Sequence, residues 1–98
     1  MTRNIYSKVI FENGTAEVLE TYGAEQIKIQ GIGSGSYALK GRLSADCAWD
    51  TICVIKASDL SQNTTVSDTS VWVADISGYA HITVEASGFT KIYATVLG

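Results

Sequence analysis

The sequence predicts a small all-β fold, an antiparallel β-sandwich of jelly-roll or Ig-like type with about eight strands. Apolar residues recur at every second position over much of the chain, which is the spacing of a strand with one buried face and one exposed face. Clusters of Gly, Ser and Asn interrupt these stretches at intervals of about 8–12 residues, as in sandwiches and small barrels. The 98 residues, of which 46% are hydrophobic and 17% charged, fit a single domain over residues 1–98.

The alternation of apolar and polar residues is clearest over residues 26–30, 81–86 and 91–96. Asn13-Gly14 separates two apolar stretches and predicts a two-residue hairpin turn, because both residue types accept positive φ angles. On this basis we predict strands over residues 5–11, 15–21, 25–30, 36–43, 51–56, 71–75, 80–86 and 90–97.

Gly-rich and Ser-rich segments predict the remaining turns, chiefly at residues 31–35 and 87–88. Helical signals are confined to a mixed pattern at residues 17–22 and a single turn at residues 57–60. Residues 58–70, rich in Ser, Thr, Asn and Asp, form the longest predicted loop. We expect this loop either to be mobile or to contact a partner.

Residues 26–39 resemble residues 81–93, since both combine an alternating stretch, a turn of Gly and Ser, and a second stretch. The repeat predicts two similar hairpins that face each other across one core. The chain contains no proline, so its edge strands must be protected by charge, by Gly bulges or by pairing with another copy. A chain of this length buries a limited core, and assembly into a homo-oligomer, a trimer or dimer, is expected to stabilise it.

Composition argues against several classes of partner. The net charge is −3 and the basic residues are scattered, which disfavours a nucleic-acid interface. No apolar stretch approaches the roughly 20 residues that span a membrane, and the N-terminal residues lack the apolar segment of a signal peptide. We therefore expect synthesis in the cytosol, with Cys47 and Cys53 as free thiols. Cys53, between Ile52 and Val54, is predicted to be a small core side chain.

We predict no catalytic, cofactor-binding or metal-binding residues. His81 is the single histidine and lies on the polar side of its predicted strand, without a neighbouring nucleophile. The Gly31–Gly35 segment precedes a strand, whereas a phosphate-binding loop precedes a helix. Several carboxylates lie near predicted turns without the spacing of a calcium loop, and a surface calcium ion held by scattered residues stays an alternative: Asp46, Asp50, Asp59, Asp68 and Asp75.

One series of motifs resembles a known family of domains. The segment Gly33-Ser-Gly-Ser-Tyr-Ala-Leu-Lys-Gly-Arg-Leu-Ser44 is followed by a polar turn, by Trp49, and by Val71-Trp-Val-Ala-Asp-Ile-Ser-Gly-Tyr79. Residues 25–98 are similar in this order to small β-sandwich domains of tailed-bacteriophage virion proteins, including capsid decoration (cement) proteins, head fibres and tail components. The usual Asp-Gly turn before the Trp is replaced by residues 45–48, so the register of that turn is not carried over.

The resemblance implies a virion structural protein that is made in the host cytoplasm and lies on the capsid surface. The most concrete form is a decoration protein that bridges subunits of the major capsid protein. Separately, the sequence shows no nucleophile–base pair, metal cluster or cofactor loop, so we expect no enzymatic activity. Residues 1–11 are the candidate N-terminal arm or edge strand that grips a neighbour. The interface candidates are Ile5, Tyr6, Val9, Phe11, Trp72 and Tyr79.

Two alternatives stay open. A phage tail or fibre component would use the same fold, and a carbohydrate-binding module would use Trp49 and Trp72 as a platform on which sugar rings stack. Both Trp residues also suit a core or a protein interface, where Trp is common.

Overall fold

The computed structural model describes residues 5–97, and all of its regular structure is antiparallel β, which confirms the predicted fold class. The described residues contain no helix, so the helical signal at residues 17–22 was wrong. Residues 57–60 form the single short turn that was predicted there, with a hydrogen bond of 2.8 Å from Leu60 N to the Lys56 carbonyl oxygen. None of the described residues therefore belongs to a helix that is long and apolar enough to cross a membrane. The strands are β1 (Ile5–Glu12), β2 (Thr15–Ala16), β3 (Leu19–Glu20), β4 (Gln26–Arg42), β5 (Asp50–Ile52), β6 (Val54–Lys56), β7 (Gln62–Asn63), β8 (Trp72–Asp75) and β9 (His81–Leu97).

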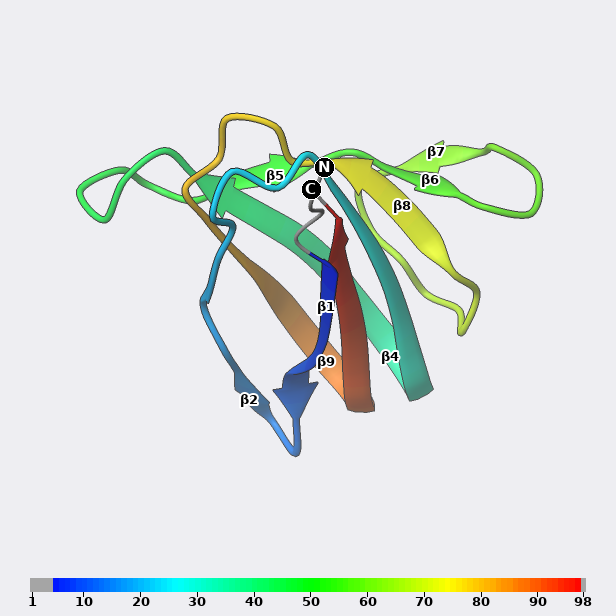
Figure 1. Ribbon diagram of the computed structural model, residues 1–98. Helices are drawn as coiled ribbons and strands as arrows, with labels where there is room; N and C mark the ends of the chain where they lie inside the picture. Colours follow the sequence, from blue (N-terminus) through cyan, green and yellow to red (C-terminus); the bar gives the residue numbers. More distant parts are fainter. Residues whose placement is uncertain (1–4, 98) are drawn as a thin grey trace.

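All strands belong to one hydrogen-bonded sheet with the order β2-β1-β9-β4-β8-β6-β7, in which β3 also pairs with β9 and β5 with β4. Strands β4 and β9 are each 17 residues long and pair along their whole length. Both bend near the middle, so the sheet folds over and its two halves face each other (Figure 1). We call the half with β1, β2, β6, β7 and β8 the large layer, and the half with β3 and β5 the small layer.

The bend replaces two of the predicted turns. Gly35 and Gly88 have φ angles of 143° and 95°, and the register of the β4–β9 pair shifts on either side of Gly33. A Cβ atom on Gly35 would collide with the carbonyl oxygen of Ser87, and one on Gly88 would lie 2.7 Å from the carbonyl oxygen of Ser34. The two strands therefore cross too closely at this corner for any side chain.

Because of this corner, the predicted strands 25–30 and 36–43 form the single strand β4, and 80–86 and 90–97 form the single strand β9. The prediction of two hairpins facing each other was therefore wrong. The internal repeat has a different physical origin. Strands β4 and β9 pair with each other, so each consists of two halves with alternating apolar and polar residues, joined by a flexible corner.

One hydrophobic core fills the space between the layers. Burial of one large aliphatic side chain in such a core stabilises a fold by about 1.5–3 kcal/mol. A register shift between Val9 and Phe11 marks a β-bulge in β1, and the bulge allows the consecutive residues Ile10 and Phe11 both to be buried. The core residues with no exposed surface are Ile10, Ile27, Ile76, Ile82, Ile92 and Val96.

Three further details refine the predicted elements. The Asn13-Gly14 hairpin is confirmed, with φ angles of 51° and 84°. The predicted strand 15–21 is divided into β2 and β3, and the predicted strand 51–56 into β5 and β6. Cys53, which separates β5 from β6, is exposed, so its prediction as a core residue was wrong. The alternation places its neighbours Ile52 and Val54 in the core and turns Cys53 outward.

Candidate binding surface

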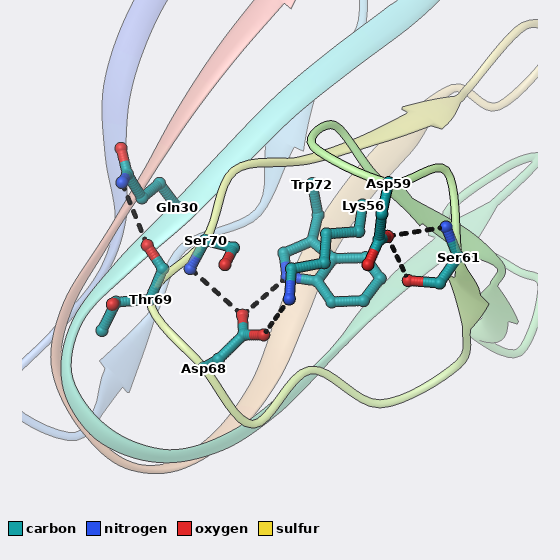
Figure 2. A network of polar contacts seen from close by, with 8 residues as sticks. All are labelled: Gln30, Lys56, Asp59, Ser61, Asp68, Thr69, Ser70 and Trp72. Carbon is teal, nitrogen blue, oxygen red and sulfur yellow. Dashed lines mark hydrogen bonds and ion pairs between the residues drawn. The ribbon is translucent and has the colours of Figure 1, made fainter.

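The segment between β6 and β8 is fastened to the sheet by the carboxylate of Asp68 (Figure 2). Its Oδ1 atom accepts hydrogen bonds from the indole Nε1 of Trp72 at 2.9 Å and from the backbone N–H of Ser70 at 3.1 Å. Its Oδ2 atom lies 3.2 Å from the ammonium of Lys56. The bond from Trp72 is the main cause that lowers the pKa of Asp68, and the contacts with Ser70 and Lys56 lower it further. Asp68 is therefore an ionised acceptor for a Trp that is only 5% exposed.

The same segment is tied to β4 at two more places. Val66 is buried and exchanges two backbone hydrogen bonds with Tyr37, at 2.9 and 2.8 Å. The side-chain amide of Gln30 donates to the carbonyl oxygen of Thr69 at 3.0 Å, as Figure 2 shows. The long predicted loop over residues 58–70 thus contains the short strand β7 and is anchored along its second half.

Tyr37 lies at the centre of this anchored region. Its ring packs edge-on against Phe89, with 5.3 Å between the ring centroids. Its hydroxyl is buried and has no hydrogen-bond partner among the described residues. Burial, and to a smaller extent the charge of Asp68, raise the pKa of Tyr37 far above its usual value. The hydroxyl is therefore neutral at physiological pH.

Two shallow hollows lie beside the anchored segment and share Val71 as a wall. One, of about 370 Å³, is lined by residues 57–58 and 70–71. The other, of about 200 Å³, lies on the outer side of the large layer and is lined by Lys28, Ile29, Gln30, Val71, Tyr93 and Thr95. Each combines an apolar wall with polar side chains, which is the composition of many binding sites.

The outer side of the large layer is rich in apolar residues. We call it the apolar face and define it by Val9, Ile32, Ile55, Val71, Val73 and Tyr93. Tyr93 pairs with Val9 on one side and with Gln30 on the other, and Val73 lies between Lys28 and Ile55. Tyr93 is 41% exposed and Ile32 is 51% exposed. Lys28 projects from the middle of this face and forms no ion pair with any residue that the structure describes.

The outer side of the small layer is polar by contrast. Arg42 Nε donates to His81 Nδ1 at 3.1 Å, and His81 Nε2 lies 3.9 Å from a carboxylate oxygen of Glu20. The guanidinium of Arg42 also stacks over the ring of Trp49, at 4.2 Å from its centroid. These contacts connect β3, β9, β4 and the segment after β4. Over residues 5–97, no three side chains of His, Cys, Asp or Glu gather into a potential metal site.

The structure distributes the predicted interface residues over several environments. Phe11 and Trp72 are buried in the core, and Tyr79 is partly buried where its ring covers Gly41. Val9 is half-buried on the apolar face. The backbones of residues 5 and 6 pair with the end of β9, so this part of the predicted arm is strand β1, and residues 1–4 lie outside the described residues.

Sequence reasoning missed most of the apolar face. A usable signal was present at residues 71–74, where Val, Trp, Val and Ala leave neither side of the strand polar. The glycan platform of two Trp rings is not formed, because Trp72 is buried and Arg42 covers Trp49.

Comparisons with known proteins identify the fold. No family model and no curated protein matches the chain. The solved structure of the SPBc2 prophage-derived protein YomS is similar with a TM-score of 0.86 and 14% identity, over 100% of this chain and 96% of YomS. The PBSX exported protein XepA is similar with a TM-score of 0.88 and 19% identity, over 100% of this chain. The chain spans only 39% of XepA. The molecule is thus an all-β sandwich domain of a fold that occurs in phage-derived proteins.

Proposed function

We propose that this chain is a structural protein of a bacteriophage that acts by binding another protein and catalyses no reaction. The observation that carries the proposal is the apolar face, since a sheet side that stays in water normally presents polar residues. Partly exposed apolar side chains lie there beside Lys28, which has no ion-pair partner among residues 5–97, and they adjoin an anchored loop. The similarity to a prophage-derived protein over nearly its whole length supports a phage origin.

The concrete form that we propose is a capsid decoration protein. Copies of the chain would bind across neighbouring subunits of the major capsid protein, either singly or as trimers or dimers. A specific interface needs about 800 Å² from each partner. The molecule measures 35 × 30 × 21 Å, so its broad faces are large enough for such a contact. Repetition over a shell multiplies a modest affinity at each site.

The test uses expanded, undecorated capsids of the phage that encodes the chain. Wild-type protein is expected to co-sediment with them and to raise their disruption temperature. Tyr93→Ser and Lys28→Glu are expected to weaken binding by about tenfold or more, equivalent to about 1.4 kcal/mol. Lys40→Glu is the matched control, because Lys40 lies on the same strand but in the small layer, where it donates to Thr51. Absence of wild-type binding would refute the decoration role.

A second candidate is a phage binding protein that acts outside the particle, supported by the description of XepA as an exported protein. The two candidates predict different locations after phage induction. A decoration protein is present in purified particles at a fixed ratio to the capsid protein. A secreted protein is found in the medium and is lost from the particles on purification.

A further inference from the structure

The two most exposed large apolar side chains among the described residues both occupy unfavourable backbone conformations. Leu60 is 74% exposed with a φ angle of 63°, and Tyr22 is 71% exposed with a φ angle of 50°. Positive φ is uncommon outside glycine, and for a bulky residue it costs conformational energy. In the described part of the chain the only other non-glycine residue of this kind is Asn13. Neither Leu60 nor Tyr22 compensates this cost by burying its side chain in the fold.

A second turn in the chain has nearly the same backbone angles as the turn that contains Tyr22. The pair Asn13-Gly14 has φ angles of 51° and 84°, and the pair Tyr22-Gly23 has φ angles of 50° and 79°. Both are two-residue turns with two positive φ angles, for which Asn-Gly is a preferred sequence. A hydrogen bond of 2.9 Å from Ala24 N to the Thr21 carbonyl oxygen closes the second turn. The same backbone thus carries the favoured residue in one turn and an exposed aromatic ring in the other.

Leu60 is held outward by a closed turn between β6 and β7. Its N–H donates to the carbonyl oxygen of Lys56 at 2.8 Å, and Lys56 N–H donates to the carbonyl oxygen of Ser61 at 2.8 Å. The Asp59 carboxylate accepts two hydrogen bonds from Ser61, at 2.6 and 3.0 Å (Figure 2). The hydroxyl bond contributes most to lowering the pKa of Asp59, followed by the backbone bond. This turn adjoins the 370 Å³ hollow, which residues 57–58 line.

We propose that Tyr22 and Leu60 are two anchors that insert into apolar pockets of a partner protein. The inference rests on the proposed docking function and adds two side chains outside the apolar face to those that contact the partner. The two residues lie on different connections, β3–β4 and β6–β7, which Figure 1 shows in separate parts of the molecule. One copy therefore engages two separate sites, as bridging of neighbouring subunits requires.

Charge defines the partner's chemistry. Glu25, an exposed residue, lies three positions after Tyr22 in the chain, and the exposed Asp59 directly precedes Leu60. Each anchor thus has an exposed carboxylate within three residues in the sequence, and the chain carries a net charge of −3, which fits an apolar pocket rimmed by Lys or Arg. The same carboxylates would be repelled by an anionic lipid surface, so a protein pocket is the occupant that the charges favour.

The first test measures stability and needs no partner. Tyr22→Asn and Leu60→Asn place at these exposed positions a polar residue that tolerates positive φ. Relief of the strain is expected to raise Tm by about 4–8 °C for each variant. Leu43→Asn is the matched control, because Leu43 is 65% exposed and has no positive φ angle, and its Tm is expected to stay near wild type. Unchanged or lowered Tm in both anchor variants would overturn the inference.

The second test measures binding to expanded, undecorated capsids with the same proteins. Each anchor variant is expected to lose about tenfold in affinity or more despite its higher Tm, and Leu43→Asn less than about twofold. If the variant with both anchors replaced binds capsids as tightly as wild type does, the inference is overturned and the proposed function stays intact. Absence of wild-type binding would overturn the proposed function and the partner assignment together. If wild type co-sediments with phosphatidylcholine–phosphatidylserine vesicles and the double variant does not, the anchors bind a lipid surface, and the proposal of a protein pocket is overturned.

Discussion

Replacement of Asp68 by alanine removes the acceptor that fastens the β6–β8 segment to the sheet. The carboxylate accepts from Trp72 Nε1 and Ser70 N and pairs with Lys56, so three contacts are lost together. Asp68→Asn separates two of these effects. Its amide oxygen can still accept from the indole, whereas the ion pair with Lys56 is lost.

The magnitude follows from the environment of each lost contact. A buried donor without an acceptor costs about 1–3 kcal/mol, and the indole N–H of Trp72 is such a donor. The ion pair is partly exposed and contributes about 0–1 kcal/mol. Asp68→Ala is therefore expected to destabilise the fold by about 1–4 kcal/mol and Asp68→Asn by about 1 kcal/mol or less.

Urea unfolding followed by Trp fluorescence measures the difference. With a slope of about 2 kcal/mol/M, this loss is expected to lower the midpoint for Asp68→Ala by about 0.5–2 M while the slope stays constant. Asp59→Ala is the control, because Asp59 is exposed and its carboxylate accepts hydrogen bonds from the nearby Ser61. Its midpoint is expected to lie near wild type. Equal midpoints for the Ala and Asn variants of Asp68 would refute the role assigned to the indole hydrogen bond.

Three further outcomes are expected. The pKa of Asp68 is lower in the folded than in the unfolded chain. The ionised carboxylate therefore stabilises the fold fully above about pH 4, and this stabilisation is lost as the pH falls through the folded pKa. The difference in unfolding free energy between wild type and Asp68→Asn should accordingly shrink in urea titrations below pH 4. Tyr37→Phe removes a buried hydroxyl that lacks a partner among residues 5–97, and calorimetry should show unchanged stability or a gain of up to about 1 kcal/mol. Gly35→Ala should lose more than about 3 kcal/mol because its Cβ meets backbone, whereas Gly14→Ala, with open space around it, should lose about 1–2 kcal/mol in the same measurement.

The strands were predictable because alternation is a local property. Each inward position, such as Ile27 or Ile82, is marked by its immediate neighbours, and the Asn13-Gly14 turn is determined by two adjacent residues. The corner was not predictable in the same way. Gly and Ser suit a chain reversal and a sharp bend equally, and the bend is determined by the partner strand, which pairs Gln26 with Leu97 from the far end of the chain.

The anchored segment and the apolar face were harder to predict from the sequence. Asp68 was one of five carboxylates near predicted turns, and only the fold brings Lys56 to it and buries the indole of Trp72 against it. The outward apolar residues 71 and 73 were visible in the sequence. Their meaning depends on β6, β4 and β9 supplying Ile55, Ile32 and Tyr93 to the same side, which is a property of the strand order.

The full-length pairing of β4 with β9 has a consequence for biosynthesis. Residues 26–42 leave the ribosome long before residues 81–97, and until then neither half of β4 has its central partner. Strand β1 likewise cannot pair with β9 until the end of β9 has been synthesised. Because pairings between distant segments dominate, the nascent chain keeps its apolar positions exposed until residue 97 has emerged, and folding is then expected to be slow and all-or-none. The apolar surface that stays exposed until then is expected to make the incomplete chain prone to aggregation.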